Sequence, residues 1–268
     1  MGNFFTVKNI ALALGSGSAK GAAHIGVIEA FLAAGCRITA LSGTSMGAIV
    51  ASYCAFNKLH TLKQRLLNMN KSSAFLKLDF SLAGGLLSGK KIMSIFEEDL
   101  GNTNIEDAPI PLFITAANLD TGEKHIFDNG PLIPAIRASI SIPGIFKPFF
   151  YNNAYYVDGA LIDPVPSKIL AEKGYKNIIA VHLNKHLEHR PQDKKFTIAE
   201  TMGRAVSITA KALAEASSGG ERVLIKPNLA GIGMFEIHKT AEIINIGRNA
   251  ADEIIALGAL RRKPPFFR

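Results

Sequence analysis

Cysteine is scarce in this 268-residue sequence, and no apolar run is long enough to cross a membrane. Cys36 and Cys54 both lie in apolar surroundings, which excludes a disulfide framework and indicates free thiols in a reducing compartment. A membrane-spanning helix needs about 20 apolar residues, and a secretory signal needs a basic start before an apolar core. The sequence shows neither, so we predict a cytoplasmic protein.

Internal repeats, low-complexity tracts and linker-like segments are also absent from the sequence. An α/β fold of this length commonly forms one domain. We therefore expect residues 1–268 to form a single domain. Its core should span about 8–260, and residues 261–268 should form a basic, aromatic tail.

Signals for metal or nucleotide binding are weak. Residues 84–91 approach the phosphate-binding P-loop pattern, but Lys91 stands where a hydroxyl would bind Mg²⁺. His182, His186 and His189 are close in sequence, but no cysteine or regular helix orients them for zinc. We predict no metal and no cofactor.

The charge of the chain favours anionic partners. Lysine and arginine number 30 against 22 acidic residues, which gives a net charge of +8. The basic residues are scattered and match no nucleic-acid-binding motif, so we expect no nucleic-acid partner. An anionic phospholipid surface fits the same charge. Peripheral contact with the inner membrane surface is therefore the alternative to a purely cytoplasmic location.

Short apolar runs alternate with helical patterns along the whole chain. This alternation predicts a mainly parallel sheet covered by helices on both faces, a three-layer α/β/α sandwich. The expected strands lie near residues 8–14, 37–42, 111–118, 155–157, 177–183 and 222–226.

The most informative segment is Gly43-Thr44-Ser45-Met46-Gly47, which follows an apolar strand pattern and precedes a helical one. A serine between two glycines at such a turn is how a hydrolase raises a hydroxyl above the edge of its sheet. The positive end of the following helix lies beneath that hydroxyl. Ser45 is therefore the candidate nucleophile; a tight turn carrying an inactive serine is the alternative.

A second glycine-rich loop, residues 15–21, follows the strand pattern at 10–14 and opens a helix. Free backbone N–H groups at such a loop bind negative charge, either a nucleotide phosphate or the oxyanion of acyl transfer. Lys20 stands where the dinucleotide motif needs glycine, and the next strand leads to Ser45. The oxyanion is therefore the better candidate, and the loop supplies Gly15, Gly17, Ser18, Ala19, Lys20 and Gly21.

A serine nucleophile needs a base within hydrogen-bond reach. Asp158-Gly159-Ala160 places a carboxylate where an aromatic strand pattern meets glycine, although a plain Asp-Gly turn fits as well. Of the seven histidines, His238 is the best candidate for a triad because it opens a helix, whereas His182 lies in an apolar strand pattern. Asp163 precedes a proline, which indicates a turn or a helix cap.

Residues 15–21, 43–47 and 158–160 together resemble the three signatures of the patatin-like phospholipase family, in order and at compatible spacing. Further segments also look like bacterial members of the family, and the resemblance covers about residues 8–260. These segments are residues 116–122, 138–144 and 164–166.

The resemblance implies an α/β fold that hydrolyses lipid acyl esters with a Ser45–Asp158 dyad and no metal. It also implies that the N–H groups of Gly17, Ser18 and Ala19 form the oxyanion hole. Ser16 and Ser18 replace glycines common in the family, and Lys20 replaces arginine; backbone donors survive these changes.

We therefore predict a phospholipase A, lysophospholipase or esterase that works through an acyl-enzyme. A non-catalytic regulatory member that binds lipid or protein, and an acyltransferase, are the alternatives. The substrate would be a phospholipid or another acyl ester. The oligomeric state is open, with a homodimer as one possibility, and residues 75–89 form either a mobile lid or an ordinary helix.

Overall fold

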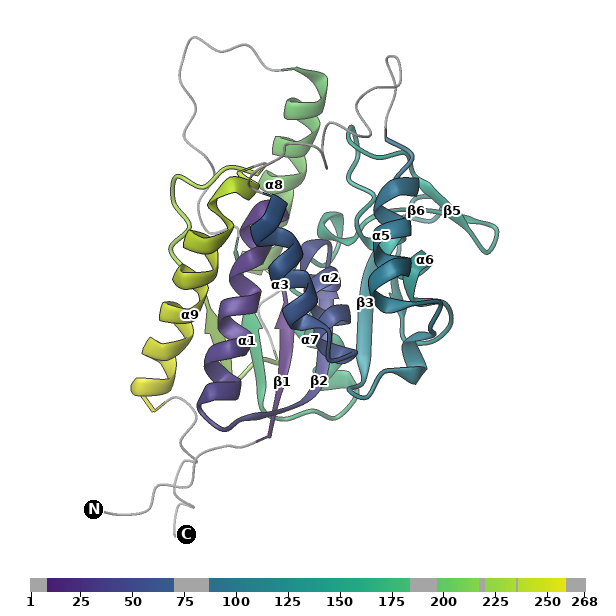
Figure 1. Ribbon diagram of the computed structural model, residues 1–268. Coiled ribbons are helices and arrows are strands. Elements are labelled where there is room, and N and C mark those ends of the chain that lie inside the picture. The colour runs from purple at the N-terminus through teal and green to yellow at the C-terminus, as the bar shows by residue number, and fades with distance from the viewer. Residues whose placement is uncertain (1–8, 70–86, 184–196, 217–219, 235, 259–268) are drawn as a thin grey trace, which may run out of the picture.

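The computed structural model describes residues 9–69, 87–183, 197–216, 220–234 and 236–258 (Figure 1). Its strands form one sheet: β1 (Asn9–Leu14), β2 (Arg37–Thr44), β3 (Leu112–Asn118), β4 (Lys124–Phe127), β5 (Phe149–Tyr151), β6 (Ala154–Asp158), β7 (Ile178–Val181) and β8 (Val223–Ile225). The α-helices are α1 (Ala23–Ala33), α2 (Met46–Ala55), α3 (Leu59–Asn68), α5 (Lys90–Leu100), α6 (Leu132–Ser139), α7 (Ser167–Glu172), α8 (Ile198–Ala216) and α9 (Thr240–Ala256). Short 3-10 helices are η1 (Ser18–Ala22), η3 (Ile105–Asp107), η4 (Gly159–Leu161) and η5 (Ile237–Lys239).

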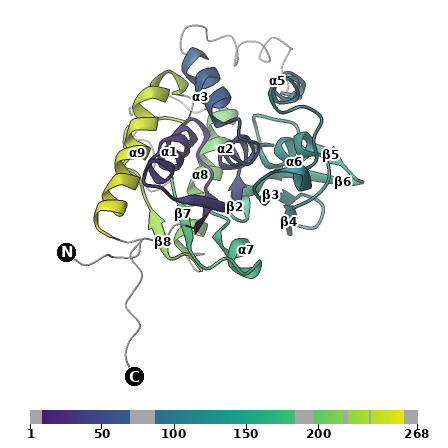
Figure 2. The same ribbon diagram turned by 60° about the horizontal axis from the view of Figure 1, so that its bottom comes forward.

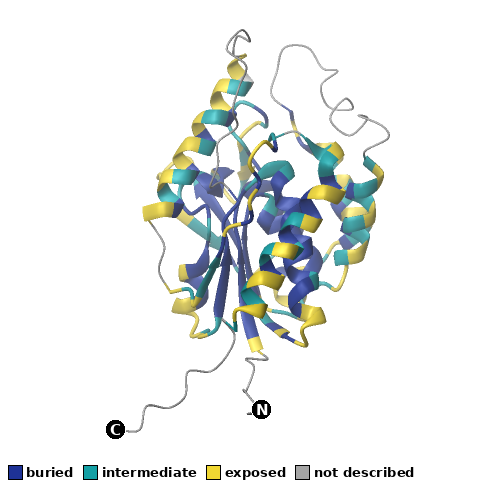
Figure 3. Ribbon diagram, turned by 90° about the vertical axis from the view of Figure 1, so that its left-hand side faces the viewer, coloured by how far each residue is buried: buried dark blue, intermediate teal, exposed yellow. Residues whose placement is uncertain are grey.

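Helices cover both faces of the sheet, because its central strands are apolar on both faces. Ile10, Leu12 and Leu14 of β1 face the large core under α1, α2 and α9, while Ala11 and Ala13 face the smaller core under α7. Figure 2 shows α7 on the side of the sheet opposite α1 and α2. Figure 3 shows buried strands between helices whose outer sides are exposed. The predicted three-layer α/β/α arrangement is confirmed.

The sheet is parallel in its central part and antiparallel at one end. Strands β8, β7, β1, β2 and β3 are parallel neighbours, whereas β3–β4, β3–β6 and β5–β6 are antiparallel pairs. The six strands expected from the sequence are present, with ends that differ by at most two residues. The sequence analysis missed β4 and β5, which have only four and three residues and are half-exposed; β4 mixes polar and apolar residues, and β5 is too short to stand out as a strand.

Strand β3 has β4 on one side, and β2 followed by β6 on the other. Ile114 pairs with Gly43 of β2 and also with β4, and Ala116 pairs with Asp158 of β6 and also with β4. A strand has two hydrogen-bonding edges, and β4 occupies one edge of β3. β2 and β6 must therefore share the other edge. The end of β6 therefore meets the end of β2, just where the chain turns into α2.

Several sequence predictions lie outside the described residues: positions 75–86 of the 75–89 segment, His186 and His189, and the tail at 261–268. Among the described helices, none is long and apolar enough to cross a membrane. The single-domain boundary stays a prediction.

Candidate active site

Ser45 lies in the sharp turn between β2 and α2, with φ of 58° and ψ of −125°. This backbone conformation is rare for a residue with a side chain. The turn requires glycine on both sides of Ser45, because a larger residue at either position would clash with the backbone. A Cβ on Gly43 would lie 2.5 Å from the Gly47 carbonyl oxygen, and one on Gly47 would lie 2.6 Å from the Gly15 carbonyl oxygen. The elbow predicted from the Gly-Thr-Ser-Met-Gly segment is therefore present in its expected strand–turn–helix setting.

The structure brings Ser45 and Asp158 together. The Ser45 hydroxyl donates a hydrogen bond of 2.6 Å to Asp158 Oδ2, and the Ala160 N–H donates one of 2.8 Å to Oδ1. Gly159 allows this turn, because a Cβ there would collide with the Thr115 carbonyl oxygen. Ser45 and Asp158 are 3% and 1% exposed. The two oxygens of one carboxylate therefore hold the serine hydroxyl and the start of η4.

Burial raises the pKa of Asp158 from 3.8 to about 6, and the hydrogen bonds from Ser45 and Ala160 act in the opposite direction. The sign of this shift follows from the cost of a carboxylate charge in a buried site. At neutral pH the carboxylate is ionised, and it is more basic than an exposed aspartate. Such a group can accept the proton of a neighbouring hydroxyl.

Among the described residues, no histidine hydrogen-bonds to the Ser45 hydroxyl. The side chain of His238, the triad candidate from the sequence, is 63% exposed and lies 3.9 Å from Glu236. His182 is buried just after β7, as its strand pattern predicted. His24 is fully buried, its Nε2 donates to the Gly15 carbonyl at 2.7 Å, and burial lowers its pKa to about 4.

The glycine loop lies against the elbow, with Gly21 in contact with Met46. Its N–H groups are partly engaged: Gly15 donates to the Val181 carbonyl at 3.0 Å. Lys20 donates to the Gly17 carbonyl within the loop, also at 3.0 Å. These bonds fix the loop between β1 and α1.

Three of the six predicted donors are already used. Besides the N–H groups of Gly15 and Lys20, the Ala19 N–H donates to the Met234 carbonyl at 3.1 Å, which corrects the assignment of all three to the oxyanion hole. The sequence could not show this bond, because Met234 is more than 200 residues away. Among the described residues, the N–H groups of Gly17 and Ser18 donate to no backbone carbonyl. Ser18 has a positive φ of 48°, a local strain that the turn at the start of η1 imposes.

Three polar contacts around the site were not predicted. The Ser45 N–H donates to Ser139 Oγ at 2.9 Å; the segment 138–144 was noted only for its resemblance. Asp163 pairs with Lys124 at 3.0 Å, and its carbonyl accepts the Thr44 hydroxyl. The Asp163 carbonyl therefore holds the elbow, while its carboxylate is paired with β4 and caps no described helix. The expected turn is present, because the Asp163 N–H donates to the Gly159 carbonyl at 2.8 Å.

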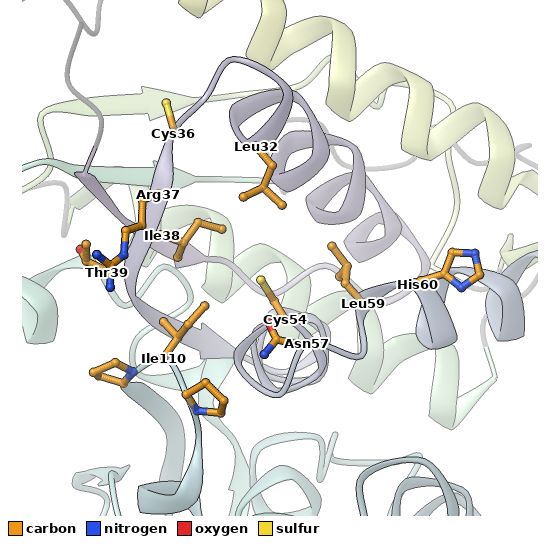
Figure 4. A pocket seen from close by; sticks show the side chains of 12 residues that line it. Leu32, Cys36, Arg37, Ile38, Thr39, Cys54, Asn57, Leu59, His60 and Ile110 are labelled. Atoms are coloured by element: carbon orange, nitrogen blue, oxygen red, sulfur yellow. The ribbon is translucent and has the colours of Figure 1, made fainter.

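A separate pocket of about 610 Å³ lies at the start of β2, the end of the strand away from Ser45 (Figure 4). Both cysteines line it, and both are free, as predicted. Burial raises the pKa of Cys36, and that of Cys54 to about 12, so neither thiol is an activated nucleophile. The lining comprises Leu32, Cys36, Arg37, Ile38, Thr39, Cys54, Asn57, Leu59, His60, Pro109, Ile110 and Pro111.

Residues 12–171 match the family model described as patatin-like phospholipase. The chain belongs to this family. The match contains both Ser45 and Asp158, and membership supports lipid hydrolysis at the level of the family. Within the described residues, no cluster of three or more His, Cys, Asp or Glu side chains could hold a metal ion.

The relatives of this patatin-like chain include an uncharacterized NTE family protein of Mycobacterium tuberculosis. It is 37% identical over 202 residues, which cover 75% of this chain and 56% of that protein. Neuropathy target esterase sws of Drosophila melanogaster is 28% identical over 189 residues, 68% of this chain and 13% of that protein. The chain thus spans little more than half the length of the mycobacterial relative.

Among solved structures, VipD from Legionella pneumophila has a TM-score of 0.52 and 15% sequence identity, covering 95% of this chain and 67% of that one. At this level of identity the likeness concerns the fold alone. It agrees with the patatin-like α/β architecture described above.

Proposed function

We propose that this chain is a serine acyl-ester hydrolase of the phospholipase A, lysophospholipase or esterase type, with Ser45 as nucleophile and Asp158 as base. The observation that carries the proposal is the 2.6 Å hydrogen bond between Ser45 Oγ and Asp158 Oδ2 in a buried site. A hydroxyl at this distance from a buried, ionised carboxylate can lose its proton as it attacks.

In the acylation step, Ser45 Oγ bonds to the ester carbonyl carbon while its proton passes to Asp158. The tetrahedral intermediate collapses, and the leaving alcohol takes that proton. Water then attacks the acyl-enzyme, Asp158 accepts a proton from the water, and the proton returns to Ser45 as the fatty acid leaves. The sequence of steps is neutral overall and needs no redox partner.

The oxyanion would be held by the N–H groups of Gly17 and Ser18. Two features support this choice: neither N–H is bound to a described backbone carbonyl, and the loop contacts the elbow at Met46. The Ser45 N–H itself is taken by Ser139 Oγ, so it cannot supply this contact. Donors aimed at developing negative charge stabilise such intermediates by several kcal/mol, about 3 per donor in a well-studied protease.

The proposed substrate is a phospholipid or another lipid ester, met at an anionic membrane surface. Family membership and the net charge of +8 support this. Cytoplasmic location and peripheral membrane contact belong to the same proposal.

The test is labelling by a fluorophosphonate probe, together with hydrolysis of acyl esters from short nitrophenyl esters to phospholipids. Ser45→Ala should abolish both without unfolding the chain, since alanine fits the same turn; the rate should fall by several orders of magnitude. Ser52→Ala is the matched control, because Ser52 is another buried serine of the same segment and its hydroxyl donates only to the Ala48 carbonyl. A wild type that takes no label would favour a non-catalytic member of the family.

A further inference from the structure

Two residues at the end of α6, Ser139 and Ser141, each contact one member of the proposed dyad. Ser139 Oγ accepts the Ser45 N–H at 2.9 Å, and the Ser141 carbonyl accepts the Asp158 N–H at 3.0 Å. Ser139 and Ser141 are fully buried. One short segment therefore fixes the backbone positions of the nucleophile and of the base.

The Ser139 hydroxyl takes the place of a bond in the sheet. Its oxygen accepts from Ser45 N–H, and its proton is donated to the Thr115 carbonyl at 2.7 Å. Thr115 is the last residue of β3 that pairs with β2, opposite Thr44. Because Ser45 turns away from the sheet there, its N–H cannot reach β3 directly. The hydroxyl bridges the gap, and both buried backbone groups are satisfied.

We propose that Ser139 is a positioning residue, which holds Ser45 in the turn that places its hydroxyl on Asp158. This inference rests on the proposed function. The φ of 58° at Ser45 is costly for a residue with a side chain, and it persists only where the surroundings hold it. The bond to Ser139 is such a restraint. Without it, a return of Ser45 to ordinary backbone angles would carry Oγ away from the carboxylate.

The segment is itself anchored by a buried arginine. Arg137 donates to Ser141 Oγ at 2.6 Å, to the Ser88 carbonyl at 3.0 Å and to the Lys147 carbonyl at 3.1 Å. Its guanidinium also lies 4.9 Å from the centre of the Phe146 ring. These contacts hold the end of α6 in place, so the Ser139 hydroxyl stays in position to accept the Ser45 N–H.

The experiment compares Ser139→Ala, Ser139→Thr and the control Ser52→Ala in three assays: fluorophosphonate labelling, hydrolysis of a small soluble nitrophenyl ester, and unfolding in urea. For folded Ser139→Ala we expect the labelling rate and kcat to fall about tenfold or more, because the Ser45 N–H loses its buried partner. KM should stay within about twofold, since Ser139 is fully buried and its hydroxyl is engaged by Ser45 and Thr115. Ser139→Thr keeps the hydroxyl and should recover most of the loss, and Ser52→Ala should match the wild type.

A pH profile separates positioning from plain stabilisation. The Ser45 hydrogen bond lowers the pKa of Asp158, so a displaced Ser45 should move the midpoint of the rate profile upward in Ser139→Ala. A change that merely destabilises the fold would leave the midpoint where it is. If Ser139→Ala does not fold, Ser139→Cys keeps the side-chain volume with a weakly bonding thiol and serves the same test.

Folded Ser139→Ala that labels at the wild-type rate, with an unchanged midpoint, would overturn the inference. So would a Ser139→Thr variant that stays as slow as Ser139→Ala while folding normally. Failure of the proposed function looks different: the wild type would take no label, or Ser45→Ala would keep it.

Discussion

Asp158 and His24 are both fully buried, and burial moves their pKa values in opposite directions. That of Asp158 rises to about 6, and that of His24 falls to about 4. At neutral pH the carboxylate is charged and the imidazole is neutral. The neutral His24 donates to the Gly15 carbonyl, so it holds the start of the glycine loop without adding charge to the site.

The first residue-scale prediction concerns the base. Hydrolysis of a soluble ester should rise with pH around a midpoint near 6, because the rate depends on ionised Asp158. From sequence alone this midpoint would be about 4, the ordinary value for aspartate. Burial moves it close to the histidine range, so the midpoint does not by itself separate a dyad from a triad.

Substitutions can distinguish a Ser–Asp dyad from a triad that includes a histidine. Asp158→Asn should lose nearly all activity while it stays folded, because asparagine keeps the shape and cannot accept the proton. His238→Ala and His182→Ala should keep most activity, measured with the same ester after folding is checked by circular dichroism. A folded histidine variant as inactive as Asp158→Asn would point to a triad.

The pKa shifts also make a prediction about stability. The folded state holds the proton of Asp158 more tightly than the unfolded chain does. The stabilising contribution of Asp158 to the free energy of unfolding is therefore lost as pH rises from about 4 to 6. His24 acts in the opposite sense: the unfolded chain binds its proton more tightly, so its contribution grows as pH rises from about 4 to 6.5. In the wild type these two opposite changes in the free energy of unfolding with pH largely cancel.

Asp158→Asn should remove the pH dependence of stability that comes from Asp158 and leave that of His24. Its free energy of unfolding, relative to wild type, should increase by about 3 kcal/mol between pH 4 and pH 7, since each pKa unit corresponds to about 1.4 kcal/mol. Urea unfolding at several pH values measures this. Parallel curves for the two proteins would mean that Asp158 titrates normally in the folded state.

At the scale of elements, the site is made by the meeting of strand ends. The end of β2 carries Ser45, the end of β6 carries Asp158, and both pair with the same side of β3. The glycine loop after β1 completes the arrangement from the neighbouring strand. The turns between these elements are tight, so their geometry depends on glycine.

Gly47→Ala tests that dependence. The added methyl group would contact the carbonyl oxygens of Leu14 and Gly15, so the glycine loop and the elbow would have to separate. We expect a loss of about 1–3 kcal/mol in unfolding free energy and a larger relative loss of activity. Gly203→Ala, in helix α8, is the control. Its added methyl group would lie 3.2 Å from the flexible side chain of Met234. If the two variants behave alike, the close approach at the elbow does not matter.

At the scale of the whole molecule, charge and family point to a lipid surface. The chain carries a net charge of +8 and belongs to the patatin-like phospholipases. Electrostatic attraction to a membrane acts over only about 8 Å at physiological ionic strength, so it depends strongly on salt.

Binding to vesicles should therefore strengthen with the fraction of anionic lipid and weaken with added salt, as measured by co-sedimentation. Removal of residues 261–268 should weaken this binding and leave hydrolysis of a soluble ester unchanged, because the segment is basic and aromatic. Binding that ignores both lipid charge and salt would contradict the electrostatic part and favour a soluble esterase.

The amino-acid sequence predicted the layers of the fold and selected Ser45 and Asp158, which the structure brings into hydrogen-bond contact. Alternating apolar runs and helical patterns are local, so strands β1, β2, β3 and β7 could be placed without a structure. The glycines around Ser45 and after Asp158 also act locally, because they permit turns that other residues cannot adopt. The strands β4 and β5 were missed because they are only four and three residues long, and pairing with β3 and β6 is what extends the sheet to them.

Only the tertiary structure decided how the site residues meet and which groups are free. The Ser45–Asp158 distance depends on two strands sharing one side of β3, a relation between segments 113 residues apart. The engagement of Ala19 by Met234, the bridge through Ser139 and the raised pKa of Asp158 depend on packing in the same way. Hydrogen bonds and desolvation act through space, so a linear pattern cannot specify them.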